Sequence, residues 1–447
     1  MFFPRAVNAL ISWLEDITYL RLVRNAGWLT GSTLISGILG LSAITLAAKN
    51  IGASNFGNII MVITYVGIVN KLLNFQSWQF LMKNGAISLL QNDTDRLRRL
   101  IKFSALLDVG GAVASTIVAF LCASYVGEIL GWSDNTTYFA ELFSFTILFQ
   151  LTGMPSAVLR LLNQFKTLAI QKVLLGSLNL IGVIIALLIS SGAESILLAF
   201  AISNVISSLY LILMAWHQLS KNKIKKVWRS SLSGICSHEK HIWHFVFYSN
   251  IESSIKIFRD IDIFLIKYFL SSEAVGLYAL GRRIAEALHM IIDSFFQAIY
   301  PEFSKIIASH DKATLYRLIK QSSLSVGGFS TLLWIAFLLL GQWLIPAIFG
   351  LSFSSTYELA SICMLGNVIW AFSQPISPIL YNLGQAKNVF RITTASISIY
   401  IISLLIMLPK LGAIGAAISY TAYFLVWVIF TSLAVRHCLK VYTWEAE

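Results

Sequence analysis

Residues 168–190 read LAIQKVLLGSLNLIGVIIALLIS, an apolar run in which Lys172 is the only charged side chain. About 20 apolar residues in a helix are enough to cross the roughly 30 Å of hydrocarbon in a bilayer. Similar runs recur along the whole chain, whose 447 residues are 57% hydrophobic and only 12% charged. A soluble protein cannot bury that much apolar surface, so the sequence predicts an all-α polytopic membrane protein.

The apolar runs divide the chain into about twelve predicted transmembrane helices. Their ranges are 25–48, 57–82, 101–126, 138–162, 168–190, 193–215, 243–270, 274–300, 322–347, 356–380, 390–409 and 412–435.

The net charge of +12 follows the topology of a membrane protein. Most Lys and Arg residues lie at the two ends of the chain and in every second loop, namely 83–100, 163–167, 216–242, 301–321 and 381–389. The alternate loops instead carry acids such as Glu128 and Glu194. Because basic loops stay on the cytoplasmic side, we expect a multi-pass membrane protein with both termini in the cytoplasm. The positive charge therefore does not indicate nucleic-acid binding.

The two halves of the chain share local patterns at one offset. Gly57 and Gly276 are 219 residues apart, Pro155 and Pro375 are 220 apart, and Gly192-Ala193 matches Gly412-Ala413. We interpret this as two six-helix lobes around a central cavity, with a substrate site between them. The predicted organisation is an N-terminal amphipathic cytoplasmic segment (1–24), an N-lobe (25–215), a basic cytoplasmic linker (216–242), a C-lobe (243–436) and a cytoplasmic tail (437–447).

Charged side chains gather on one face of the seventh and eighth predicted helices. With 100° per residue, Glu252, Lys256, Arg259, Asp260 and Lys267 share a face of the seventh, and Asp262 falls off its edge. Arg282, Glu286, His289 and Asp293 form a line along the eighth. A charge in a span costs about 2.5–3.5 kcal/mol on insertion scales, and such residues usually line a transport path. The pattern therefore predicts a hydrophilic lumen.

Arg259 and Arg282 fall at similar predicted depths, so both guanidinium groups can flank one cavity. Guanidinium groups suit phosphate, and Arg259, Arg282, Lys71 and Lys256 are the candidate substrate-binding residues. The candidates for ion coupling or charge pairing are Asp260, Glu286, His289 and Asp293. Pairing within the protein, for example between Arg282 and Glu286, is the alternative interpretation.

Two other features bear on function. Asp108 lies near the cytoplasmic end of its predicted span, where we expect it to be solvated. Gly-rich phosphate loops, nucleophile motifs and zinc spacings do not occur in the cytoplasmic segments, so we predict a transporter with no cofactor and no metal rather than an enzyme.

Four stretches resemble a known family. They are GASNFG (52–57), NFQSWQ (74–79), SEAVGLYALGRR (272–283) and YPEFS (300–304). Together they are similar to the polysaccharide transporter family of the multidrug/oligosaccharidyl-lipid/polysaccharide exporter superfamily, in particular to O-antigen flippases (Wzx-type). The resemblance covers nearly the whole chain from about Asn25.

This resemblance implies a flippase of the bacterial cytoplasmic (inner) membrane that moves an undecaprenyl-diphosphate-linked oligosaccharide from the inner to the outer leaflet by alternating access. The implied partners are the lipid-linked oligosaccharide, the bilayer, a coupling proton or sodium ion, and a glycan polymerase of the same pathway. A drug/cation antiporter of the same superfamily is the first alternative, although it should favour acidic over basic lumen charge. A membrane glycan polymerase or ligase is the second, and would normally carry a large outward loop.

Overall fold

The computed structural model describes residues 17–74, 77–190, 192–232, 258–288, 312–376, 379–380 and 385–441. Within these ranges the ordered elements are all helices. Eight helical stretches among them are long and apolar enough to cross a bilayer. The prediction of an all-α polytopic membrane protein is confirmed.

The first half of the chain forms a group of helices that we call the N-terminal group. Its elements are α2 (Ile17–Leu73), α3 (Ser77–Leu90), α4 (Thr94–Leu130), α5 (Asp134–Ser144), η1 (Phe145–Phe149), α6 (Gly153–Leu161), α7 (Phe165–Ile189), α8 (Ala193–Lys221) and η2 (Val227–Arg229). α2 is broken at Gly52, whose φ of 77° lies in the left-handed region that favours glycine. It therefore supplies the first predicted span and the first part of the second.

Two predicted spans are less regular than the sequence suggested. The second, predicted over 57–82, ends as a helix at Leu73 and resumes at Ser77. The fourth, predicted over 138–162, is divided into α5, η1 and α6. Pro155 lies in the first turn of α6, where proline removes no helical hydrogen bond.

The second half forms the C-terminal group. Its elements are η3 (Phe258–Asp260), α11 (Asp262–Phe269), a helical segment over 272–288, α13 (Lys312–Phe349), η4 (Leu351–Phe353), α14 (Thr356–Ser373), η5 (Gln374–Ile376), α16 (Ala386–Leu411) and α17 (Ala413–Val441). η3 and α11 lie in the described part of the seventh predicted span, and the 272–288 segment covers the described part of the eighth.

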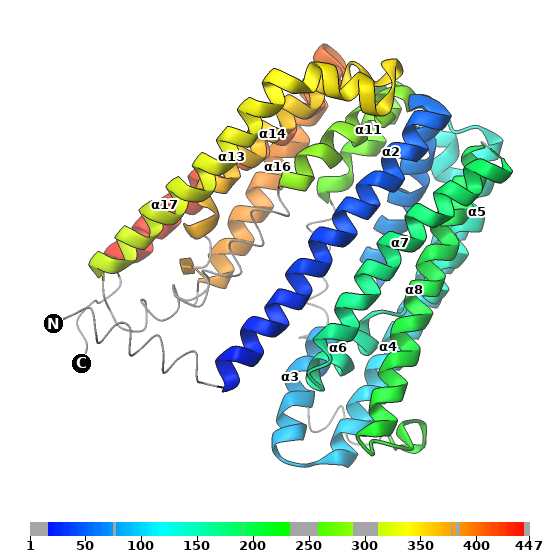
Figure 1. Cartoon of the computed structure of the whole chain (residues 1–447), viewed down its shortest axis with the longest axis vertical. Helices are drawn as coiled ribbons and strands as arrows, with labels where there is room; N and C mark the ends of the chain where they lie inside the picture. The colour runs from blue at the N-terminus through cyan, green and yellow to red at the C-terminus, as the bar shows by residue number, and fades with distance from the viewer. Residues whose placement is uncertain are drawn as a thin grey trace.

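Figure 1 shows the two groups side by side, close together at the end where α11 lies and spread apart toward the other end. One hydrophobic core continues from α2 into α11, α14 and α17. A second core lies within the N-terminal group, under α3, α6 and η2. The predicted domain boundaries stay a prediction, since residues 233–257 lie outside the described ranges.

The groups meet at a backbone-to-backbone contact between two glycines. A Cβ on Gly57 would overlap the carbonyl oxygen of Ser272, and a Cβ on Gly276 would overlap the carbonyl oxygen of Ala53. Each glycine therefore faces the residue four positions before the other. Small residues at this spacing allow helices in membranes to approach closely. The two glycines that the repeat pairs at an offset of 219 are thus in contact.

Candidate functional site

Arg282 is the centre of a network of charged side chains at the junction of the two groups. It projects from the 272–288 segment and is nearly buried. Its Nη2 donates to Asp260 Oδ1 at 2.7 Å, and its Nε donates to Glu286 Oε1 at 3.1 Å. Its Nη1 lies 3.0 Å from both carboxylate oxygens of Asp262. We call Arg259, Asp260, Asp262, Arg282 and Glu286 the Arg282 cluster.

Asp262, the first residue of α11, is completely buried. Its Oδ2 accepts hydrogen bonds from the hydroxyl groups of Tyr278 at 2.6 Å and Tyr400 at 2.8 Å. Because a buried charge is tolerated only when it is paired and hydrogen-bonded, these donors explain how a carboxylate can lie inside the bundle. Asp262 links α11 to the 272–288 segment and to α16.

The sequence placed Asp262 off the polar face, and this placement is wrong. The projection assumed one continuous α-helix over the seventh span. The chain instead forms a 3-10 helix at η3 and a turn at Ile261 before α11 begins. A 3-10 helix advances about 120° per residue rather than 100°, so the angular position of Asp262 shifts relative to Arg259. No pattern in the sequence indicates this change.

Arg259 lies beside Arg282. Its backbone carbonyl accepts a hydrogen bond from Arg282 Nη1 at 3.3 Å. Its guanidinium carbon is 6.0 Å from the ring centre of Tyr423, and that of Arg282 is 5.6 Å from Tyr420. These are cation–π distances, and both rings belong to α17. The Nε of Arg259 is buried without a hydrogen-bond partner among the described residues.

Asn367 of α14 joins the same region and was not singled out from the sequence. Its Nδ2 donates to the carbonyl of Ala285 at 2.6 Å, and its Oδ1 accepts from the Tyr420 hydroxyl at 3.4 Å. Asn367 is fully buried. It therefore links the 272–288 segment to the Tyr420 ring of α17. An asparagine in an apolar span was the only signal for it.

Among the described residues, one ion pair crosses between the groups. Lys71 Nζ, at the end of α2, lies 3.4 Å from Asp260 Oδ2. The Lys71 side chain is 57% exposed and that of Asp260 is 26% exposed. Lys71 was predicted to face the lumen, and the structure places it next to the Arg282 cluster.

The remaining predicted residues divide into two sets. Glu286 contacts Arg282 and also Arg283, whose Nη1 lies 3.5 Å from Glu286 Oε2. The Arg282–Glu286 pair that the sequence analysis kept as an alternative is therefore present. Lys256, His289 and Asp293 lie outside the described residues.

Asp108 does not lie at a solvated helix end, contrary to expectation. It is buried in α4, where it accepts hydrogen bonds from the Ser77 hydroxyl and, at 2.6 Å, from the backbone N–H of Met154. Ser77 begins α3 and Met154 lies in the first turn of α6. The carboxylate satisfies a free N–H group at the start of α6 and complements its dipole. It links α4 to two short helices, α3 and α6, each of which was predicted as part of a continuous span.

The Arg282 cluster combines strong internal pairing with one donor that is unpaired within the described part of the chain. Three carboxylates surround the Arg282 guanidinium, whereas the buried Nε–H group of Arg259 has no acceptor among the described residues. Leaving a buried donor unpaired costs about 1–3 kcal/mol. An acceptor that reached Arg259 would remove that cost. Chemically, the cluster can accept an anion at Arg259 while Arg282 stays neutralised by its own acids.

Comparison with known proteins gives a family and a fold. Residues 22–307 match the family model described as polysaccharide biosynthesis protein. The chain is 25% identical over 348 residues to inner membrane protein YghQ of Escherichia coli (strain K12), a match that covers 78% of this chain and 98% of the relative.

Two solved structures have the same fold over most of their length. The chain is similar to the lipid II flippase MurJ in an inward closed conformation, with a TM-score of 0.69, 18% identity and coverage of 91% of this chain and 87% of MurJ. It is also similar to an inward-facing multidrug resistance transporter of the MATE family in the MOP superfamily, with a TM-score of 0.67, 14% identity and coverage of 94% and 96%.

Proposed function

The chain belongs to the family of polysaccharide biosynthesis proteins, and from this premise we propose that it is a lipid-linked oligosaccharide flippase rather than an enzyme. It moves an undecaprenyl-diphosphate-linked repeat unit, of the O-antigen (Wzx) type, from the inner to the outer leaflet of the bacterial inner membrane. The relative's name, inner membrane protein, and the apolar helices of this chain support that location.

The observation that carries the proposal is the Arg282 cluster. A diphosphate headgroup is anionic, and a path through the bilayer must neutralise it. The guanidinium of Arg259 has a planar set of donors that suits phosphate, and its Nε is buried without an acceptor among the described residues. We assign Arg259 to the headgroup and Arg282 to organising the acids around it. Lys71 and Lys256 are the additional candidate cations.

Tyrosine rings beside the arginines suit the rest of the substrate. Tyr420 and Tyr423 lie against the two guanidinium groups. Aromatic rings with hydroxyl groups offer both a flat apolar face and a hydrogen-bonding edge, which sugars require. The prenyl chain can stay in lipid between helices throughout the movement.

Ion coupling is assigned to the acids of the cluster. Asp260 contacts Lys71 of the N-terminal group and Arg282 of the C-terminal group. A change in the charge on Asp260 or Glu286 would therefore alter the attraction between the groups. His289 and Asp293 are further candidates for binding the coupling proton or sodium ion.

Alternating access requires the two groups to separate where they now touch. The tight contact between Gly57 and Gly276 supports a state closed at that end, which the charge distribution predicts to be the outward side. The comparison structures, described as inward closed and inward-facing, are consistent with such a state. Opening outward would break this contact and the Lys71–Asp260 pair.

Translocation in proteoliposomes tests the proposal. The purified full-length protein is reconstituted with a fluorescent undecaprenyl-diphosphate-linked oligosaccharide, with and without an imposed proton or sodium gradient. We expect translocation with the wild type, and a decrease of at least about tenfold in its rate for Arg259→Ala. Arg391→Ala is the matched control, because Arg391 of α16 is exposed and lies outside the Arg282 cluster. If the protein instead exchanges organic cations and leaves the glycolipid in place, the antiporter alternative is correct.

A further inference from the structure

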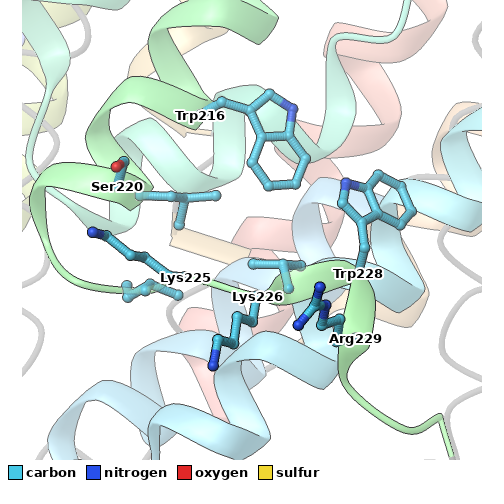
Figure 2. A pocket seen from close by; sticks show the side chains of 9 residues that line it. Trp216, Ser220, Lys225, Lys226, Trp228 and Arg229 are labelled. Atoms are coloured by element: carbon cyan, nitrogen blue, oxygen red, sulfur yellow. The ribbon is translucent and has the colours of Figure 1, made fainter.

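The end of α8 carries a pocket that has no part in the proposed transport path. Its volume is about 350 Å³, and it is lined by nine residues, Trp216, Leu219, Ser220, Ile224, Lys225, Lys226, Val227, Trp228 and Arg229. Figure 2 shows the indole rings of Trp216 and Trp228 close together on one side, with the basic side chains extending from the loop. The two ring centres are 5.8 Å apart.

The pocket combines an apolar wall with a positively charged edge. Leu219, Ile224 and Val227 are buried in the second hydrophobic core. Lys225, Lys226 and Arg229 are exposed. Among the lining residues there is no carboxylate to neutralise these three cations within the described part of the chain. The pocket therefore favours a ligand that has both an anionic group and an apolar body.

The loop that forms the pocket is held in place by the rest of the protein. Lys102 of α4 donates to the backbone carbonyl of Trp228 at 2.9 Å and to that of Ser230 at 2.8 Å. Lys226 has a φ of 61°, which a non-glycine residue rarely adopts. The burial of Val227 and the two hydrogen bonds from Lys102 stabilise this conformation. The position of the Trp228 ring is thus part of the fold.

The location of the pocket identifies the class of ligand. α8 is a candidate membrane span that ends at Lys221, so its last turns lie where hydrocarbon meets the headgroup layer. Tryptophan concentrates at this depth, and basic residues just beyond a span attract anionic lipids of the cytoplasmic leaflet. The predicted topology places this loop in the cytoplasm.

We propose that this pocket binds one anionic phospholipid of the surrounding bilayer. The headgroup phosphate lies among Lys225, Lys226 and Arg229, and the glycerol and upper acyl chain lie against Trp216, Trp228 and Leu219. Binding joins the end of α8 to the loop that Lys102 attaches to α4, and so stabilises the cytoplasmic side of the N-terminal group.

Quenching of tryptophan fluorescence by brominated lipid tests the site. The full-length protein is reconstituted in phosphatidylcholine nanodiscs that contain increasing amounts of brominated phosphatidylglycerol. The difference in quenching between the wild type and Trp228→Phe isolates the signal of the pocket. Trp228 is about half exposed, so its replacement by phenylalanine should leave the fold intact.

We expect the triple variant Lys225→Gln, Lys226→Gln, Arg229→Gln to require at least about tenfold more brominated phosphatidylglycerol for half-maximal quenching. The matched control removes three exposed cations of the C-terminal group, Lys387→Gln, Arg391→Gln and Arg436→Gln, and should behave as the wild type. High salt should weaken the wild-type signal.

Three results would overturn the proposal. Equal quenching by brominated phosphatidylcholine would indicate ordinary lipid contact without selection for charge. If the triple Gln variant gave the same quenching titration as the wild type, the basic residues would have no role in binding the lipid. Relief of quenching by millimolar-range inorganic phosphate would assign the pocket to a soluble anion instead of a lipid.

Discussion

Lys71 and Asp260, 189 residues apart in the chain, form the ion pair that joins the N-terminal group to the Arg282 cluster. Asp260 is shared, because its other oxygen accepts from Arg282 at 2.7 Å. One carboxylate therefore responds both to the charge state of the cluster and to the separation of the two groups.

Removing the lysine should affect transport more than stability. The Lys71 side chain is 57% exposed, and an ion pair with such a partner contributes about 0–1 kcal/mol, so Lys71→Ala should leave the apparent melting temperature in detergent almost unchanged. Its translocation rate should fall, because Asp260 then lacks its partner across the groups. The two measurements on one preparation separate these effects. A Lys71→Ala protein that transports at the wild-type rate would show that the pair has no role in the cycle.

Arg282→Ala should destabilise the fold strongly. The substitution leaves Asp262 buried beside Asp260 without its cation, and breaking a buried pair in this way costs about 3–5 kcal/mol. Arg283→Ala, which changes the adjacent and half-exposed arginine, should cost about 1 kcal/mol or less. Thermal unfolding of both variants in the same detergent compares them. Equal melting temperatures for the two would contradict the central position of Arg282.

Gly57→Ala and Gly276→Ala should each force the two groups apart. A methyl group at either position overlaps backbone of the partner segment, and overpacking of this kind costs about 1–3 kcal/mol. We expect normal membrane insertion but reduced glycan display, measured in cells after correction for protein abundance. Gly67→Ala is the control on the same helix, because a Cβ there meets nothing within 4 Å. Full activity of both glycine variants would argue against a tight closure at this contact.

Asp108→Ala should loosen α3 and α6. The substitution leaves the Met154 N–H group and the Ser77 hydroxyl without their acceptor, at a cost of about 1–3 kcal/mol. Glu128→Ala on the same helix, at an exposed position, should cost no more than about 0.5 kcal/mol. Limited proteolysis should then cut near residues 77 and 153 in the Asp108 variant before it cuts the control. An unchanged cleavage pattern would show that the carboxylate does not hold these helices.

The predictions from sequence succeeded where the property is local. The run at 168–190 corresponds to α7 (Phe165–Ile189), and 193–215 lies within α8, because hydrophobic length alone determines whether a helix can span a bilayer. The two glycines related by the offset of 219 residues touch in the structure, and nothing in the sequence indicated this contact. Arg259 and Arg282 were also expected at one depth, and they are neighbours in the structure.

The composition along the chain determined that this is a membrane protein and where its spans lie. It also showed that the seventh and eighth spans carry charge. The partners of each charge do not follow from composition, because they depend on how helices are rotated against one another. The 3-10 turn at η3 rotates Asp262 toward Arg282 and Tyr278 of the 272–288 segment and toward Tyr400 of α16. Only the packed structure brings these residues together, because Tyr400 lies 138 residues from Asp262 in the chain and the rotation of each helix is set by its neighbours.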